Sequence, residues 1–177
     1  AGSLARWPMD EIRLKQLEQL QERMKYTFCN RALLITSLTH KSYINENPLT
    51  GASDNERMEF LGDAVLGLCI SDLLMKKYTD LDEGALSQIR AWLVREKPLA
   101  DLALGLGLGE CLLLGRGEEN SGGRQKESLL ANALEALIAA VYLDSSFTRA
   151  KSFIKRLMAP LIDDEILLIQ CADYKTM

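Results

Sequence analysis

The stretch NERMEFLGDAVLGLCI, from Asn55 to Ile70, decides how this chain folds. Three carboxylates, Glu56, Glu59 and Asp63, stand in its first part, and the remainder is almost entirely apolar. Successive helical residues are rotated by about 100°, so the three acids share one face of a helix. A helix that is apolar all round is normally packed on every side, and we therefore expect these acids to be at least half buried. Because unpaired buried charge is costly, a positive charge must come from elsewhere.

The same arrangement recurs in the stretch SLLANALEALIAAVYLD, residues 128–144. Asn132 and Glu135 share one face there, and no Lys or Arg occurs between Lys126 and Arg149. A single acidic pair on a helix usually marks a solvated face or a partner for Lys on a neighbouring helix. Two such pairs in apolar helices instead favour a shared metal ion, and oxygen ligands without His or Cys favour Mg²⁺ or Mn²⁺. Ions of this kind serve phosphoryl transfer.

The rest of the chain also has a helical pattern, with apolar residues spaced by three and four. No segment alternates with period two for long enough to be a strand, so the expected fold class is all-α, without internal repeats. The domain is expected to occupy residues 9–168, after linker residues 1–8, and the charged stretch 115–127 is expected to be a flexible loop. Helices are expected at residues 9–26, 31–43, 55–78, 85–96, 97–108, 128–144 and 147–162.

Composition limits the class of protein. The chain has 177 residues, 47% of them hydrophobic, which suits one folded domain and excludes global disorder. Its 21 Lys and Arg against 25 Asp and Glu give a net charge of −4, which predicts no general attraction to nucleic acid or membranes. No apolar run approaches the roughly 20 residues that span a bilayer, and no signal pattern is visible. The four separated cysteines predict free thiols in the cytoplasm, and His40, the one histidine, is expected to be structural.

The motifs of the chain resemble those of a known family. NERMEFLGDAVL is similar to the core motif of the ribonuclease III family, ERLEFLGDA or ERLEFLGDS, with Met58 in place of the usual Leu. The resemblance extends over residues 26–144 in the family's order and spacing, and it implies an all-helical, dimer-forming endonuclease domain. The further matching stretches are LTHKSY (38–43), DEGALSQIRAWLV (82–94), LGLGE (106–110), SGGRQKESLLAN (121–132) and EALIAAVYLD (135–144).

The resemblance also implies roles for particular residues. Phe60 matches an aromatic residue that inserts into a pocket of the partner subunit, although by simple burial it could equally belong to the core. One position departs from the family, because the usual Asp at the third metal position is Asn132 here, which lowers the charge of the ligand set from −4 to −3 and predicts weaker metal binding. Natural tolerance, an engineered change and weakened catalysis would each explain Asn132. The implied metal ligands are Glu59, Asp63, Asn132 and Glu135, with Asp63 and Glu135 catalytic and with Glu56 and Glu83 as supporting acids.

The implied activity is Mg²⁺-dependent cleavage of double-stranded RNA by a homodimer, in ribosomal and messenger RNA maturation, with Mn²⁺ as a substitute. Products would carry 5′-phosphate and 3′-hydroxyl ends with short 3′ overhangs. Recognition of A-form RNA is expected to rest on shape. The segment DYKTM, in residues 169–177, resembles the start of a double-stranded RNA-binding domain. Candidate phosphate contacts form a loose group: Arg90, Arg95, Lys97, Arg116, Arg124 and Lys126.

Two other readings of the sequence stay open. The same fold could serve as a noncatalytic double-stranded RNA-binding protein or dimeric scaffold, with Asn132 as a sign of decay. An unrelated helical interaction protein would show no metal-dependent change in stability. The retention of Glu59, Asp63 and Glu135 favours the enzyme, since a protein released from catalysis need not keep them.

Overall fold

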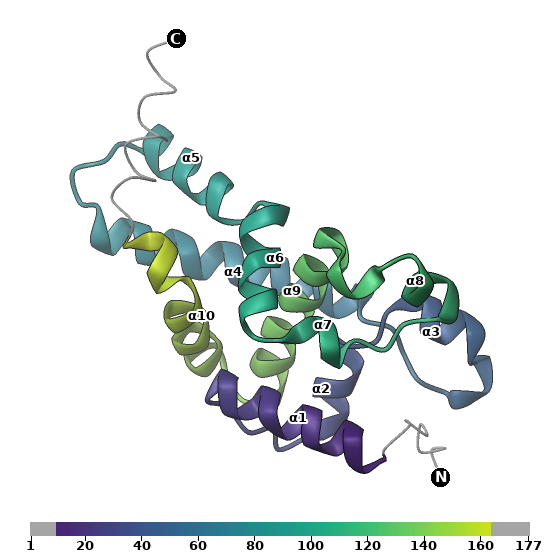
Figure 1. Cartoon of the computed structure of the whole chain (residues 1–177). Coiled ribbons are helices and arrows are strands. Elements are labelled where there is room, and N and C mark those ends of the chain that lie inside the picture. The colour runs from purple at the N-terminus through teal and green to yellow at the C-terminus, as the bar shows by residue number, and fades with distance from the viewer. Residues whose placement is uncertain (1–9, 164–177) are drawn as a thin grey trace.

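The computed structural model describes residues 10–163, and within that range the chain is built from helices joined by short turns (Figure 1). No β-strand occurs among these residues, which confirms the all-α fold class. No helix in the described range is long and apolar enough to cross a membrane. The α-helices are α1 (Glu11–Met24), α2 (Arg31–Ser37), α3 (Lys41–Glu46), α4 (Glu56–Lys77), α5 (Glu83–Leu93), α6 (Glu96–Gly105), α7 (Leu108–Cys111), α8 (Arg116–Asn120), α9 (Glu127–Asp144) and α10 (Phe147–Ile162). Two 3₁₀ turns, η1 (Pro48–Thr50) and η2 (Gly123–Gln125), complete the set.

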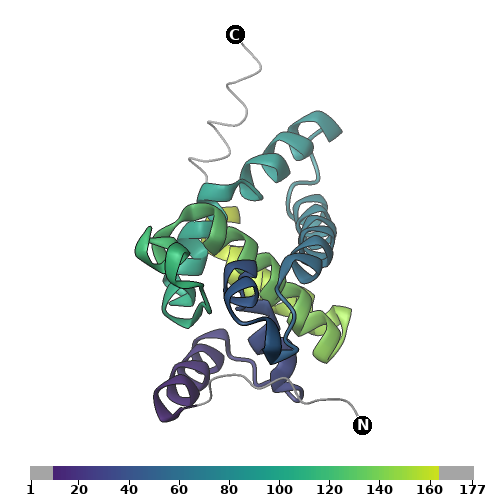
Figure 2. The same cartoon turned by 90° about the vertical axis from the view of Figure 1, so that its right-hand side faces the viewer.

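Helix α9 forms the centre of the core. Figures 1 and 2 show it crossing the middle of the molecule, where α2, α4, α6 and α10 pack against it. Every residue from Ala136 to Val141 is buried, as expected for a helix that is apolar on all sides. Alanines at several of these positions leave room for neighbouring helices to approach closely. The rest of the molecule is therefore organised around the helix that carries Asn132 and Glu135.

The backbones of α4 and α9 approach each other closely at Gly62. A Cβ atom at Gly62 would overlap the carbonyl oxygen of Glu135, so only glycine fits there without a shift of the helices. Glu59 and Asp63 lie on either side of this crossing point along α4. The glycine in the motif thus sets how near the acids of α4 come to those of α9.

The helix expected at residues 31–43 is interrupted. α2 ends at Ser37 and α3 begins at Lys41, because the intervening backbone pairs with a distant segment through an isolated parallel bridge between Thr39 and Leu113. The amide of Leu113 donates to the carbonyl of Leu38 at 2.8 Å, and the amide of His40 donates to the carbonyl of Leu113 at 3.0 Å. His40 then caps α3, its Nδ1 accepting from the amide of Ser42 at 3.2 Å, which confirms its structural role.

Other helix predictions need smaller corrections. The loop expected at residues 115–127 contains α8 and η2, where the carboxylate of Glu46 accepts hydrogen bonds from the amides of Arg116 and Gly117. The helix expected at 97–108 ends at Gly105, and Gly107, with φ of 71°, turns the chain into α7. The helix at 147–162 has the expected bounds. The predicted linker at 1–8 and the segment at 169–177 lie outside the described residues.

One face of α4 is not covered within a single chain. Phe60, Leu68 and Met75 are 82%, 59% and 66% exposed, and their spacing places them along one stripe of the helix. The expectation that α4 is packed on every side is therefore wrong for the isolated chain. α9, α5 and α10 cover its other faces, and none of the described elements covers this stripe.

Candidate active site

The predicted metal ligands lie on α4 and α9, two helices that pack closely against each other. Glu59 and Asp63 come from the first turns of α4, and Asn132 and Glu135 come from the first half of α9. The close backbone approach at Gly62 brings the two sets together. Asp63 and Glu59 lie near enough to Glu135 for their charges to affect its carboxyl group.

The carboxyl group of Glu135 is the most perturbed in the site. Burial raises its pKa to about 7, and the neighbouring negative charges of Asp63 and Glu59 add to the effect. The pKa of Glu59 is also raised, first by burial and then by Glu56 and Asp63, while Lys41 opposes the shift. A cation bound among these carboxylates would relieve their repulsion.

Glu56 has a different environment from the other acids. Its carboxylate pairs with the ammonium group of Lys41 on α3 at 2.8 Å, and this contact lowers the pKa of Glu56. Lys41, Glu56 and Glu59 line a small cavity of about 60 Å³ together with Asn132. Sequence reasoning missed Lys41, although it lies in the motif LTHKSY; only the tertiary structure brings its ammonium group to 2.8 Å from the Glu56 carboxylate.

Asn55 holds the start of α4 in place and was also missed. Its side chain is 4% exposed, and its Nδ2 donates to the carbonyl of Ser37 at 3.1 Å. Its backbone amide donates to the carbonyl of Thr39 at 2.9 Å. These bonds tie the first turn of α4, which carries Glu56 and Glu59, to the end of α2. The signal available in the sequence was an Asn directly before the acidic helix.

Burial of the acids differs from the expectation. Glu59, Asn132 and Glu135 are partly buried, but Glu56 and Asp63 are exposed, so at least half burial is wrong for those two. Glu83 is exposed in the first turn of α5 and accepts a hydrogen bond from the Ser87 hydroxyl, four residues on in its own helix, at 2.8 Å.

The four candidate metal ligands have the chemistry that a hard divalent ion prefers, since they offer carboxylate and amide oxygens without His or Cys. Among residues 10–163, no three His, Cys, Asp or Glu side chains are grouped so that they could hold an ion by themselves. Asn132 adds an amide oxygen, which is a ligand without a charge. An ion here would need that amide oxygen and water molecules beside the carboxylates.

Most of the candidate phosphate-binding cations have other partners in the described chain. Arg124 makes a paired contact with the carboxylate of Glu119, and its Nη1 donates to the carbonyls of Gly109 and Leu112, both at 2.9 Å. This arginine therefore fixes the turn before α9. The others have one or two contacts or remain at the surface: Lys97 pairs with Asp101 and Glu127, Lys126 with Glu118, Arg90 donates to Ser71, and Arg95 and Arg116 are exposed.

Phe60 belongs to the surface of the single chain. Its side chain is 82% exposed, so the alternative that it is a core residue is wrong. It lies at the edge of a cavity of about 730 Å³ that Leu33, Leu61 and Leu143 also line. A large exposed aromatic beside an apolar cavity is typical of a surface that another protein covers.

The fold and the paired acids define a helical nuclease domain, and comparison with known proteins gives the family. A family model described as Ribonuclease-III-like matches residues 30–161. The chain belongs to the ribonuclease III family, whose members are endoribonucleases and generally metal-dependent. Curated relatives named Ribonuclease 3 include that of Syntrophobacter fumaroxidans, 47% identical over 164 residues, and that of Listeria monocytogenes, 43% identical over 163 residues. These alignments cover 90% and 92% of this chain and 68% and 71% of the relatives, so the chain spans about two thirds of their length.

Solved structures show the same fold. The nuclease domain of ribonuclease III from Campylobacter jejuni is 44% identical, with a TM-score of 0.74, and the match covers 80% of this chain and 95% of that one. That structure concerns flexibility in a region involved in dimer formation of the domain. A second structure of that nuclease domain gives the same TM-score and identity. The region that the family model matches, residues 30–161, contains all four candidate metal ligands.

Proposed function

We propose that this chain cleaves double-stranded RNA in a metal-dependent reaction, in the maturation of ribosomal and messenger RNA in the cytoplasm. The products would carry 5′-phosphate and 3′-hydroxyl ends with short 3′ overhangs. The observation that carries the proposal is the close approach of α4 to α9, where Glu59 and Asn132 line one cavity and where burial and the nearby charges of Asp63 and Glu59 raise the pKa of Glu135 to about 7. Strongly perturbed carboxyl groups of this kind are enriched at functional sites.

The proposed metal is Mg²⁺, with Mn²⁺ as a substitute. Glu59, Asp63 and Glu135 would hold it through their carboxylates and Asn132 through its amide oxygen, with water in the remaining positions. When bound, the ion supplies a Lewis acid for the scissile phosphate and an activated water. Because the ligand set carries one charge fewer than in the usual family pattern, the chain is expected to bind the ion more weakly.

The acidic residues of the chain have different proposed roles. Asp63 and Glu135 are the proposed catalytic groups, acting through the ion that they would hold. Glu56 is held by Lys41 at 2.8 Å, which suits a supporting acid that orients neighbours or meets the substrate. Glu83 is proposed as a second supporting acid at the start of α5.

The proposed partner of the domain is a second copy of itself. The uncovered stripe of α4, with Phe60, Leu68 and Met75, supplies an apolar surface for it, and Phe60 is proposed to enter a pocket of the partner subunit. Two copies would place two acidic sites across one RNA duplex, so that each cuts one strand. The duplex would be recognised by its A-form shape, with Arg95, Arg116 and the other surface cations as phosphate contacts.

A noncatalytic double-stranded RNA-binding or scaffold protein is the second candidate. Asn132 favours it, because this residue lacks the charge of the usual Asp. It is also favoured because, among residues 10–163, no three Asp, Glu, His or Cys side chains are grouped so that they could hold an ion unaided. The two candidates predict different behaviour toward metal and RNA. Only the enzyme requires Glu135 for its effect on RNA.

The test is incubation of duplex and single-stranded RNA with the chain in Mg²⁺, Mn²⁺ or EDTA, followed by mapping of the product ends. We expect cleavage of the duplex only, in either metal, and none in EDTA. Glu135→Gln should abolish it, whereas Glu127→Gln, an exposed position on the same helix, should not. Cleavage that persists in Glu135→Gln or in EDTA would contradict the proposal, and retained duplex binding without any cleavage would favour the scaffold.

A further inference from the structure

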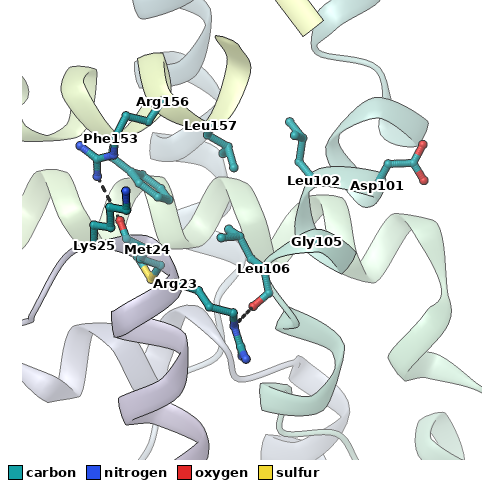
Figure 3. Close-up of a pocket in the computed structure, with 10 residues that line it drawn as sticks. All are labelled: Arg23, Met24, Lys25, Asp101, Leu102, Gly105, Leu106, Phe153, Arg156 and Leu157. Atoms are coloured by element: carbon teal, nitrogen blue, oxygen red, sulfur yellow. Dashed lines mark hydrogen bonds between the residues drawn. The ribbon is translucent and has the colours of Figure 1, made fainter. Parts of the chain in front are cut away.

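A second cavity lies away from the acidic site, between the end of α1, the end of α6 and the middle of α10 (Figure 3). Its volume is about 360 Å³, within the range of about 300–1,000 Å³ usual for ligand pockets. It shares no lining residue with the cavity beside Glu59 and Asn132. We call it the α1–α6–α10 cleft.

The floor of the cleft is apolar. Leu102 and Leu106 from α6 and its C-terminal turn face Phe153 and Leu157 from α10, and Figure 3 shows these side chains directed toward the space between the helices. Phe153 is buried, whereas the three leucines are only partly buried. Gly105 lies at the mouth, where a side chain would meet open space. Apolar side chains of a ligand could therefore replace water on this floor.

The rim of the cleft is basic. Arg156 is fixed by a hydrogen bond from its Nη2 to the carbonyl of Met24 at 3.0 Å, and Arg23 by one from its Nε to the carbonyl of Leu106 at 2.8 Å. Lys25 ends α1 in a left-handed conformation, with φ of 53°, and Figure 3 shows it beside Arg156. Each arginine thus has a fixed position and keeps further N–H donors free of these bonds.

These three cations have no acidic partner in the described part of the chain. No ion pair joins Arg23, Lys25 or Arg156 to a carboxylate within residues 10–163. The one acid that lines the cleft, Asp101, is paired with Lys97 at 2.6 Å. In a chain with a net charge of −4, three unneutralised cations around one apolar cleft form a local exception.

We propose that the α1–α6–α10 cleft binds an acidic, leucine-rich peptide segment of a partner protein. The partner's apolar side chains would occupy the floor, and its carboxylates would meet the cations at the rim, since guanidinium groups bind carboxylates in paired geometry. Cations at both Arg23 and the Lys25–Arg156 side suit a segment with more than one acid. RNA fits less well, because a phosphate backbone has nothing to place on four apolar side chains.

The probe for the test is a short fluorescent peptide of alternating Glu-Glu and Leu-Leu pairs, with binding followed by fluorescence anisotropy. Lys25→Gly removes one rim charge and also relieves the left-handed conformation, so this variant should fold at least as well as the parent. Gly105→Leu places a side chain in the open mouth of the cleft. Lys155→Ala is the matched control, because it removes an exposed cation of α10 that does not line the cleft.

We expect Lys25→Gly to weaken peptide binding about two- to five-fold, as for one partly solvated ion pair, and Gly105→Leu to weaken it further by filling the site. Lys155→Ala should bind like the parent, and thermal melts should show that all variants are folded. A peptide with Lys in place of Glu, or with Ser in place of Leu, should not bind. The proposal is overturned if the acidic peptide fails to bind at millimolar concentration, if the control variant weakens binding equally, or if short duplex RNA displaces the peptide.

Discussion

Glu135→Gln should stabilise the metal-free protein at alkaline pH. The folded protein raises the pKa of Glu135 from 4.5 to about 7, so the ionised side chain is less stable in the fold than in the unfolded chain. Each pKa unit of such a difference corresponds to about 1.4 kcal/mol, so the shift from 4.5 to about 7 sets an upper limit of about 3.4 kcal/mol. Because the side chain is only partly buried, screening by solvent reduces the expected cost to about 1–2 kcal/mol. Glutamine keeps the shape of the protonated acid and avoids that cost.

The pH dependence gives the sharpest test. A carboxyl group whose pKa is higher in the folded state binds more protons there, so its contribution to stability falls as pH rises from about 4.5 through about 7. In EDTA at pH 8, the variant should melt about 3–6 °C above the parent, and the difference should vanish below about pH 4.5. Protein concentration is held constant, since dimer formation also affects melting.

The control and the refuting results follow from the same reasoning. Glu22→Gln, at an exposed position of α1, should leave melting unchanged at both pH values. Mg²⁺ or Mn²⁺ should stabilise the parent more than Glu135→Gln, because the ion relieves the repulsion that the variant lacks. A gain in the variant that is the same at pH 4 and pH 8, or no gain at either, would refute the account of the site given above.

Three further predictions concern the geometry around the site. Gly62→Ala should lower the free energy of unfolding by about 1–3 kcal/mol, measured by urea denaturation, because its Cβ overlaps the carbonyl of Glu135. Gly67→Ala on the same helix meets open space and should be neutral or stabilising. Equal effects of the two substitutions would contradict the close contact at Gly62. Phe60→Ala should weaken dimerisation in analytical ultracentrifugation while changing monomer stability little, since the ring is 82% exposed; an unchanged dimer would exclude Phe60 from the interface. Asn132→Asp should lower the Mg²⁺ concentration for half-maximal cleavage without changing the cleavage sites; identical titrations would show that the amide does not limit metal binding.

Sequence reasoning found the acids of the site because it depends on local repetition. The apolar spacing on the two helices and the pairing of Asn132 with Glu135 are properties of short stretches, and they correctly assigned the candidate ligands to two helices that pack against each other. The position of Lys41 could not be found in this way. α3 begins where it does because Thr39 pairs with Leu113, which is distant in the chain.

Local sequence patterns also could not predict how deeply the side chains of α4 are buried. The apolar composition of α4 predicted cover on every side, yet Phe60 and Leu68 are exposed, because no described helix of this chain packs on that face. Composition specifies that a surface needs covering but not whether the cover comes from the same chain.

The sequence by itself determined the all-helical class, the family and the helices that carry the acids, because helix periodicity and motif spacing are written along the chain. Only the tertiary structure decided how the acids act together. The crossing of α4 and α9 at Gly62, the pairing of Glu56 with Lys41 and the raised pKa of Glu135 each depend on groups from distant segments. Electrostatic energies and burial sum over all such neighbours in space, and that sum exists only once the chain has folded.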